Sequence, residues 1–184
     1  MAQYIAFLRA VNVGGRVARM ADVRACLSAG GFGDVESYIQ SGNIRVSSHV
    51  DSEQEVADAI EVALAERFGF EVPALVRTPR ELAALITAAD AIPSPLPGDA
   101  RRYVAFLRRP PPPAAVATLE GWDRPHERAL VSGREVLIWL TIGAHEAKLT
   151  NARVEREIAG LATTRDIKVV RALAERWGEG QSVG

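Results

Sequence analysis

The sequence contains a single cysteine and three histidines, which limits its covalent and metal chemistry. Cys26 stands alone, so neither an intramolecular disulfide nor a cysteine-based metal cluster can form. His49, His126 and His145 are too far apart for a metal-binding spacing such as H-x-x-x-H. The sequence therefore predicts no metal site and no cofactor.

An excess of positive charge and long apolar runs are also lacking. The 184 residues carry 22 Lys and Arg against 23 Asp and Glu, for a net charge of -1, which argues against a general nucleic-acid binder. No apolar stretch approaches the roughly 20 residues of a membrane-spanning helix. No charged leader precedes the first strand-like run, Tyr4–Leu8. We therefore expect a cytoplasmic protein with no membrane partner.

Lysine is scarce as well, because only Lys148 and Lys168 interrupt an otherwise all-arginine set of basic residues. A genome rich in G and C explains this bias better than selection for phosphate contacts. A single arginine is therefore weak evidence for anion binding in this chain.

The first half of the chain has the element order of a ferredoxin-like fold. Apolar residues at consecutive positions predict a strand at 4–8, and Ser41-Gly42-Asn43 has the composition of a tight turn between two strands. Ser52 and Glu55 stand at capping-box spacing before a helix that Gly69 ends. The predicted order is strand 4–8, helix 20–29, strands 35–40 and 44–47, the capped helix and strand 72–76, which is β-α-β-β-α-β.

The second half repeats the first. Val104-Ala105-Phe106-Leu107-Arg108 matches Ile5-Ala6-Phe7-Leu8-Arg9 at four of five positions, and Ser132-Gly133-Arg134 resembles the first half's turn. We predict an α+β fold of two tandem ferredoxin-like (βαββαβ) halves, each followed by an extra helix, at 78–89 and 166–177. The halves span 1–90 and 103–184 and are joined by a Pro-rich linker at 91–102. Because the strands are apolar on both faces, the extra helices, a packing of the halves together, or both must cover the second faces.

Two loops far apart in sequence are expected to meet at one end of the first sheet. In a ferredoxin-like sheet the third strand lies antiparallel between the first two, so the loop after the first strand neighbours the turn between the second and third. Gly14-Gly15 can form a backbone nest for an anion, and arginine and amide side chains surround it. The candidate ligand-binding residues are Arg9, Asn12, Gly14, Gly15, Arg16, Gln40, Ser41, Gly42 and Asn43. Ordinary turn chemistry explains the same residues about equally well, and no nucleotide-binding motif is complete.

The motifs at these two loops resemble a known family. Leu8-Arg9-Ala10-Val11-Asn12-Val13-Gly14-Gly15, followed by Tyr38-Ile39-Gln40-Ser41-Gly42-Asn43 and later Ala162-Thr163-Thr164-Arg165, is similar to the bacterial domain-of-unknown-function family 1697 (DUF1697). The resemblance implies a tandem ferredoxin-like fold and a bacterial cytosolic protein, and it implies no activity. The chain departs from the family pattern at Ala10, where Gly is usual.

Three functions remain open from the sequence. The first is binding of a small phosphate- or carboxylate-bearing ligand at the edge formed by the Asn12–Arg16 loop and the Gln40–Asn43 turn. The second is a protein-interaction or oligomer-forming module, such as a homodimer, without catalysis. The third is nucleic-acid binding through a local arginine patch. Cys26 falls on the apolar stripe of a helix, which favours a core role over a nucleophile, so no catalytic residue is assigned and enzyme activity stays open.

Overall fold

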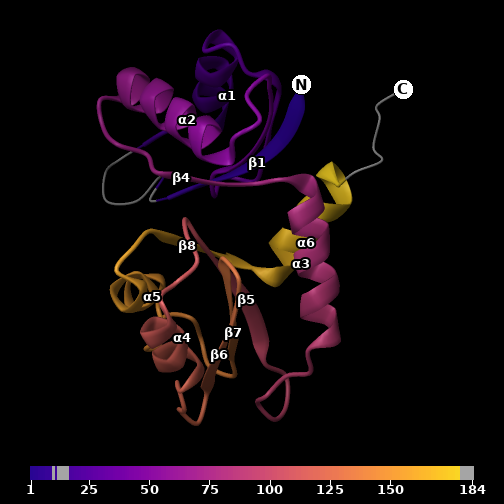
Figure 1. The fold of residues 1–184 in the computed structure, drawn as a ribbon, viewed down its shortest axis with the longest axis vertical. Helices are drawn as coiled ribbons and strands as arrows, with labels where there is room; N and C mark the ends of the chain where they lie inside the picture. Colours follow the sequence, from indigo (N-terminus) through magenta and orange to yellow (C-terminus); the bar gives the residue numbers. More distant parts are fainter. Residues whose placement is uncertain (10, 12–16, 179–184) are drawn as a thin grey trace. The chain divides into compact units, whose positions relative to one another are not determined.

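Residues 1–9, 11 and 17–178 are described from a computed structural model, shown in Figure 1. The chain divides into two compact units. Unit 1 combines Met1–Ala83 with the residues from Leu173 onward, and unit 2 is Ala84–Ala172. Each unit contains one four-stranded sheet. Within the described ranges, no helix has both the length and the apolar character that crossing a membrane requires.

Unit 1 has the predicted β-α-β-β-α-β order. Its elements are β1 (Ala2–Leu8), α1 (Met20–Ala29), β2 (Gly33–Tyr38), β3 (Asn43–Ser48), α2 (Glu53–Phe68) and β4 (Ala74–Arg77). The sheet order is β2-β3-β1-β4, and every neighbouring pair is antiparallel. The third strand therefore lies between the first two, which confirms the predicted topology.

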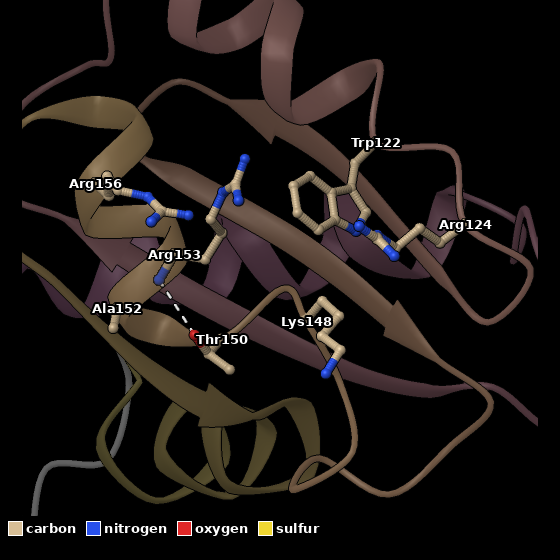
Figure 2. A pocket seen from close by; sticks show the side chains of 7 residues that line it. All are labelled: Trp122, Arg124, Lys148, Thr150, Ala152, Arg153 and Arg156. Carbon is tan, nitrogen blue, oxygen red and sulfur yellow. Dashed lines mark hydrogen bonds between the residues drawn. The ribbon is translucent and has the colours of Figure 1, made fainter.

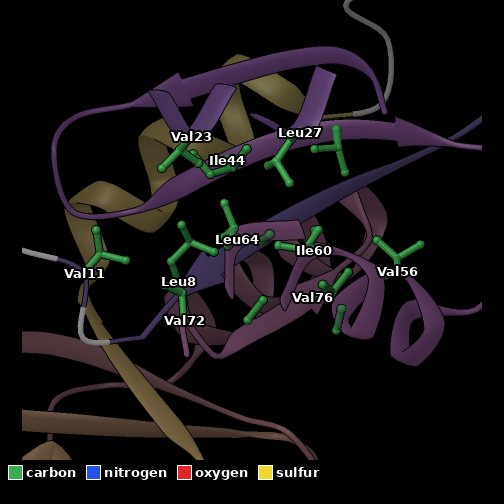
Figure 3. Close-up of a cluster of buried hydrophobic side chains, with 14 of the residues drawn as sticks. Leu8, Val11, Val23, Leu27, Ile44, Val56, Ile60, Leu64, Val72 and Val76 are labelled. Atoms are coloured by element: carbon green, nitrogen blue, oxygen red, sulfur yellow. The ribbon is translucent and has the colours of Figure 1, made fainter. Parts of the chain in front are cut away.

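The core of unit 1 lies between one face of this sheet and the helices α1 and α2. Leu8 and Ile44 of the sheet are buried with Leu27 of α1 and with Ile60 and Leu64 of α2 (Figure 3). The buried residues of α1 (Met20, Val23, Leu27) and of α2 (Val56, Ala57, Ile60, Leu64) recur at intervals of three and four, which places them on the face that meets the sheet. Local sequence therefore orients both helices.

The predicted boundaries of α2 are confirmed. The Ser52 hydroxyl accepts a hydrogen bond from the Glu55 backbone N–H at 3.3 Å, and Gly69 ends the helix. Side-chain capping satisfies one of the N–H groups that have no partner inside a helix.

Unit 2 repeats the arrangement. Its sheet has the order β6-β7-β5-β8, again with antiparallel neighbours. Two helices cross the division between the units, because the boundaries fall inside α3 and α6. The elements from α3 onward are α3 (Pro79–Ala91), β5 (Arg101–Leu107), α4 (Pro113–Glu120), β6 (Glu127–Ser132), β7 (Glu135–Leu140), α5 (Asn151–Ile158), β8 (Ala162–Asp166) and α6 (Ile167–Trp177).

The second face of the unit 1 sheet is also buried. Ile5 and Phe7 point away from the core just described and have no exposed surface. Trp177, in the last turn of α6, is 1% exposed and its indole N–H donates to the Glu36 carboxylate of β2 at 3.0 Å. The end of the extra helix α6 therefore contributes to the second side of unit 1.

Candidate functional site

The end of β1 and the turn between β2 and β3 lie side by side in unit 1. The Leu8 backbone N–H donates to the Gly42 carbonyl oxygen at 2.8 Å, and Asn43 pairs with both Phe7 and Tyr38 across the sheet. Arg9 follows Leu8 directly after β1, and its backbone N–H donates to the Pro73 carbonyl oxygen at 2.7 Å. The other predicted loop residues, Asn12, Gly14, Gly15 and Arg16, lie outside the described residues.

The turn is fixed by its own side chains. Asn43 is fully buried, and its amide donates to the Tyr38 carbonyl at 3.1 Å and to the Ser41 hydroxyl at 2.9 Å. Gly42 has φ +77, and a Cβ there would lie 2.9 Å from the Leu8 Cβ, so both the backbone and the close approach require glycine. Asn43 and Gly42 thus shape the turn, whereas the side chains of Gln40 and Ser41 are exposed.

Ile39 begins this turn in a conformation that its side chain disfavours. Its φ is 51, in the left-handed region where a β-branched residue is a genuine outlier. The side chain is 47% exposed, so core packing offers little compensation. Strained backbone of this kind clusters at functional sites.

Unit 2 has the corresponding contact at the same end of its sheet. The Leu107 backbone N–H donates to the Arg134 carbonyl oxygen at 2.8 Å, which matches the Leu8–Gly42 bond of unit 1. Arg108 and Arg109 follow β5 and line a cavity of about 300 Å³ with Pro110, Pro111 and the residues 158–161. The repeat therefore extends to the hydrogen bond that joins the two loops.

A second cavity of unit 2 collects positive charge around a buried tryptophan (Figure 2). We call this cavity of about 380 Å³ the Trp122 pocket; it is lined by Trp122, Arg124, Lys148, Thr150, Ala152, Arg153 and Arg156. The guanidinium carbons of Arg124 and Arg153 lie 5.3 Å and 4.7 Å from the Trp122 ring centroids. These distances are within the range of cation–π attraction.

Glu127, at the start of β6, bonds to two residues of this pocket, Trp122 and Lys148. Its carboxylate is 3% exposed and accepts three hydrogen bonds, from the Lys148 and Leu149 backbone N–H groups at 2.9 and 2.7 Å and from the Trp122 indole N–H at 3.0 Å. Burial alone would raise the pKa of the Glu127 carboxyl, but these bonds and the charge of Arg124 together hold the pKa below its ordinary value. Glu127 is therefore ionised at neutral pH.

A larger depression of unit 2, of about 1050 Å³, is lined by charges of both signs. Arg171 forms a two-pronged ion pair with Asp90, at 2.6 and 2.9 Å. Arg102 donates from the same region to the backbone carbonyls of Ala89 and Ile92. Four basic and four acidic side chains line the depression, so its charges balance, whereas the lining of the Trp122 pocket has four cations and no carboxylate.

Comparison with known proteins places the chain in a family. The model of a family described as "Protein of unknown function (DUF1697)" matches residues 1–137. The chain belongs to the DUF1697 family. The match includes both N-terminal motifs and the turn between β2 and β3, while Ala162–Arg165 lies beyond the matched residues.

The fold of this DUF1697 protein is similar to that of a solved structure. A conserved bacterial protein, SP0830 from Streptococcus pneumoniae, superposes with a TM-score of 0.70 and 22% sequence identity, over 96% of this chain and 98% of that chain. At this identity the likeness extends to the fold alone. No curated protein matches the chain.

Cys26 of this DUF1697 protein has the surroundings of a structural residue. Its thiol donates to the Ala63 carbonyl oxygen at 3.3 Å. Burial raises the pKa of the Cys26 thiol; the nearby Arg67 lowers it by less, and Glu66 raises it further. A protonated thiol is a poor nucleophile, which supports the core role predicted for Cys26. The described residues also contain no group of three His, Cys, Asp or Glu side chains arranged for a metal ion.

Sequence reasoning missed the Trp122 pocket of this DUF1697 protein. Its members come from two separate segments, 122–124 and 148–156, without a periodic spacing. Arginine is so common in the chain that its presence gave no signal. The only local sign was Lys148, one of two lysines, two residues before the Thr150 cap of α5.

Proposed function

We propose that this DUF1697 protein binds a small phosphate- or carboxylate-bearing ligand at the end of the unit 1 sheet, where Arg9 meets the turn before Asn43. The observation that carries the proposal is the left-handed backbone of Ile39, at φ 51 in an exposed turn. The conformation costs a β-branched residue about 1–2 kcal/mol. The neighbours of Ile39 are the exposed polar side chains of Gln40 and Ser41, which can donate to an anion.

A protein-interaction module is less well supported. It requires a contiguous exposed apolar patch, and at this turn Ile39 contributes one exposed apolar side chain. Single exposed apolar residues are normal on protein surfaces. The polar character of the turn therefore favours a small polar ligand.

A thermal-shift screen tests the proposal on wild type, Arg9→Ala and Arg80→Ala. Arg80 is an exposed arginine on α3 within unit 1 and serves as the matched control. We expect at least one nucleotide, sugar phosphate or carboxylic acid to raise the Tm of wild type and of Arg80→Ala. A ligand at 100 times its Kd adds about 2.7 kcal/mol, which is about 5–10 °C for a chain of this size. A screen without any hit, or an equal shift in Arg9→Ala, contradicts the proposal.

The strain at Ile39 gives a second test, with Val50 as control because it is 39% exposed and not among the positive-φ residues. Asn tolerates the left-handed region, so Ile39→Asn should raise the free energy of unfolding by about 0.5–1 kcal/mol in urea titrations. The same substitution should reduce the shift produced by the ligand, while Val50→Asn does neither. If Ile39→Asn gains stability but its Tm shift with the ligand equals that of wild type, the turn does not bind the ligand.

A further inference from the structure

We propose that the Trp122 pocket of unit 2 is a second binding site, for a small molecule that carries a phosphate or diphosphate group. The proposal does not depend on the function proposed for unit 1, because it concerns a different unit and a different set of residues. It rests on the convergence of cationic side chains in one cavity.

Four cationic side chains line the pocket, and two carboxylates, those of Glu157 and the buried Glu127, partly offset them. Glu157 pairs with Arg153 at 2.5 Å and more distantly with Arg156 at 4.0 Å. Within the described ranges, no carboxylate is at ion-pair distance from the Arg124 guanidinium or the Lys148 ammonium. Like charges held together repel each other, so a bound anion with two or more negative charges would stabilise this arrangement.

Two of the four cationic groups, those of Arg124 and Arg153, are held in place before any ligand arrives. Arg124 and Arg153 lie over the Trp122 ring, whose N–H is bonded to the buried Glu127. The same carboxylate accepts from the Lys148 backbone N–H, so one group positions both the ring and the segment that carries Lys148. A preorganised site loses less conformational entropy on binding.

The first turn of α5 adds the positive end of a helix dipole to the same cavity, and this end attracts anions. Thr150 caps the helix by accepting from the Arg153 backbone N–H at 3.2 Å (Figure 2). Thr150 and Ala152 both line the pocket, so the positive end of the helix dipole faces the region where the cationic side chains gather. Helix N-termini with nearby Arg and Lys bind phosphate groups.

The shape of the pocket selects among anions. Its volume of about 380 Å³ suits a small ligand. Trp122 is 8% exposed and lies under two guanidinium groups, so it offers no open face on which a nucleic-acid base can stack. A tetrahedral phosphate presents several oxygens in different directions, and it can accept from arginine forks, an ammonium group and helix N–H groups together.

Isothermal titration of the full-length protein with pyrophosphate and with inorganic phosphate, at constant ionic strength, tests the proposal. Lys148→Ala and Arg156→Ala remove exposed cations of the pocket, and each should weaken pyrophosphate binding roughly tenfold or more. Lys168→Ala and Arg109→Ala are matched controls, since both are exposed residues of unit 2 outside the pocket. The two control variants should bind pyrophosphate as wild type does, and Lys148→Arg should retain most of the affinity.

The following results would contradict the inference. Absent binding of both probes, or equal loss in the control variants, excludes a site at this pocket. Citrate binding as tightly as pyrophosphate contradicts the choice of phosphate, and a short single-stranded oligonucleotide that displaces pyrophosphate identifies a nucleic-acid surface instead. Circular dichroism of the unliganded variants confirms that lost binding does not come from unfolding.

Discussion

At the residue scale, Glu127 connects more of unit 2 than any other single carboxylate described above. Its three hydrogen bonds reach the tryptophan before β6 and the backbone of Lys148 and Leu149 before α5. Hydrogen bonds to a charged acceptor are each stronger than neutral ones. The carboxylate therefore fixes two loops that the sequence separates by more than twenty residues.

Glu127→Gln should destabilise the protein by about 1.5–3 kcal/mol at pH 7, because an amide replaces one accepting oxygen with a donor. The pKa of the folded-state carboxyl lies below its ordinary value of 4.5. The stability it contributes is therefore present above about pH 4.5 and is lost as pH falls through the lower, folded-state pKa. We expect urea titrations at pH 7, 5, 4 and 3 to show that the difference in free energy of unfolding between wild type and Glu127→Gln becomes smaller as the pH falls.

The control for this prediction is Glu120→Gln. Glu120 accepts one exposed hydrogen bond, from the Val131 backbone N–H at 3.1 Å, and its replacement should have a small effect. If the difference in free energy of unfolding between wild type and Glu127→Gln stays constant from pH 7 to pH 3, the ionised carboxylate is not what stabilises these loops.

At the scale of single elements, the end of α1 shows how two adjacent glycines differ. Gly30 has φ -76, and a Cβ there would meet the Cys26 and Leu27 carbonyl oxygens at 3.4 Å, an ordinary contact. Gly31 has φ +91 with nothing within 4 Å, so space is available but the backbone conformation disfavours any other residue. The sequence predicted that Gly30 and Gly31 end the helix, but it did not show that their backbone conformations differ.

We expect Gly30→Ala to be neutral or to raise the free energy of unfolding by up to about 1 kcal/mol, because alanine restricts the unfolded chain. Gly31→Ala should lower it by about 1–2 kcal/mol, through the strain of a left-handed alanine. Urea titrations of the two variants, which differ by one position, measure the contrast directly. Equal effects at both positions would contradict the assigned backbone conformations.

Element order and helix ends could be predicted because they depend on local residues, as the Ser52 cap and the Gly69 stop of α2 show. The strand order also followed, since short connections permit few topologies. The strand predicted at 35–40 ends instead at Tyr38, because Ile39 adopts a left-handed φ that its β-branched side chain gave no reason to expect. The Trp122 pocket could not be predicted, because it depends on tertiary contacts between segments without shared periodicity.

At the scale of the whole molecule, the repeat includes a buried arginine in each sheet. Arg77 pairs with Ile5 on β1, and Arg165 pairs with Val104 on β5, which are the equivalent positions of the repeated strand. In both, the guanidinium donates to the carbonyl oxygen of the preceding residue, at 2.8 and 2.9 Å. Burial lowers the pKa of Arg165 to about 10, so it remains charged at neutral pH. Each sheet therefore carries a buried arginine on the face away from its helices. These helices are α1 and α2 in unit 1 and α4 and α5 in unit 2.

The last turn of α6 belongs to unit 1, and a buried tryptophan there, Trp177, bonds to β2. Its ring is buried and its N–H donates to Glu36, which also pairs with Arg45 at 2.6 Å. Trp139 of unit 2 is equally buried, but within the described part of the chain its N–H has no hydrogen-bond partner. Replacing each tryptophan by phenylalanine removes similar volume, and only one of the two substitutions breaks a hydrogen bond.

Trp177→Phe should therefore lower the free energy of unfolding by about 1 kcal/mol more than Trp139→Phe does, since the Glu36 carboxylate loses a donor in the first case only. Combining Trp177→Phe with Glu36→Gln completes a double-mutant cycle, and we expect a coupling energy of about 0.5–3 kcal/mol between the two residues. Urea unfolding followed by circular dichroism gives all four values of the cycle. Additive effects would mean that the bond to Glu36 does not stabilise the fold, and that the last turn of α6 contributes to unit 1 through apolar packing alone.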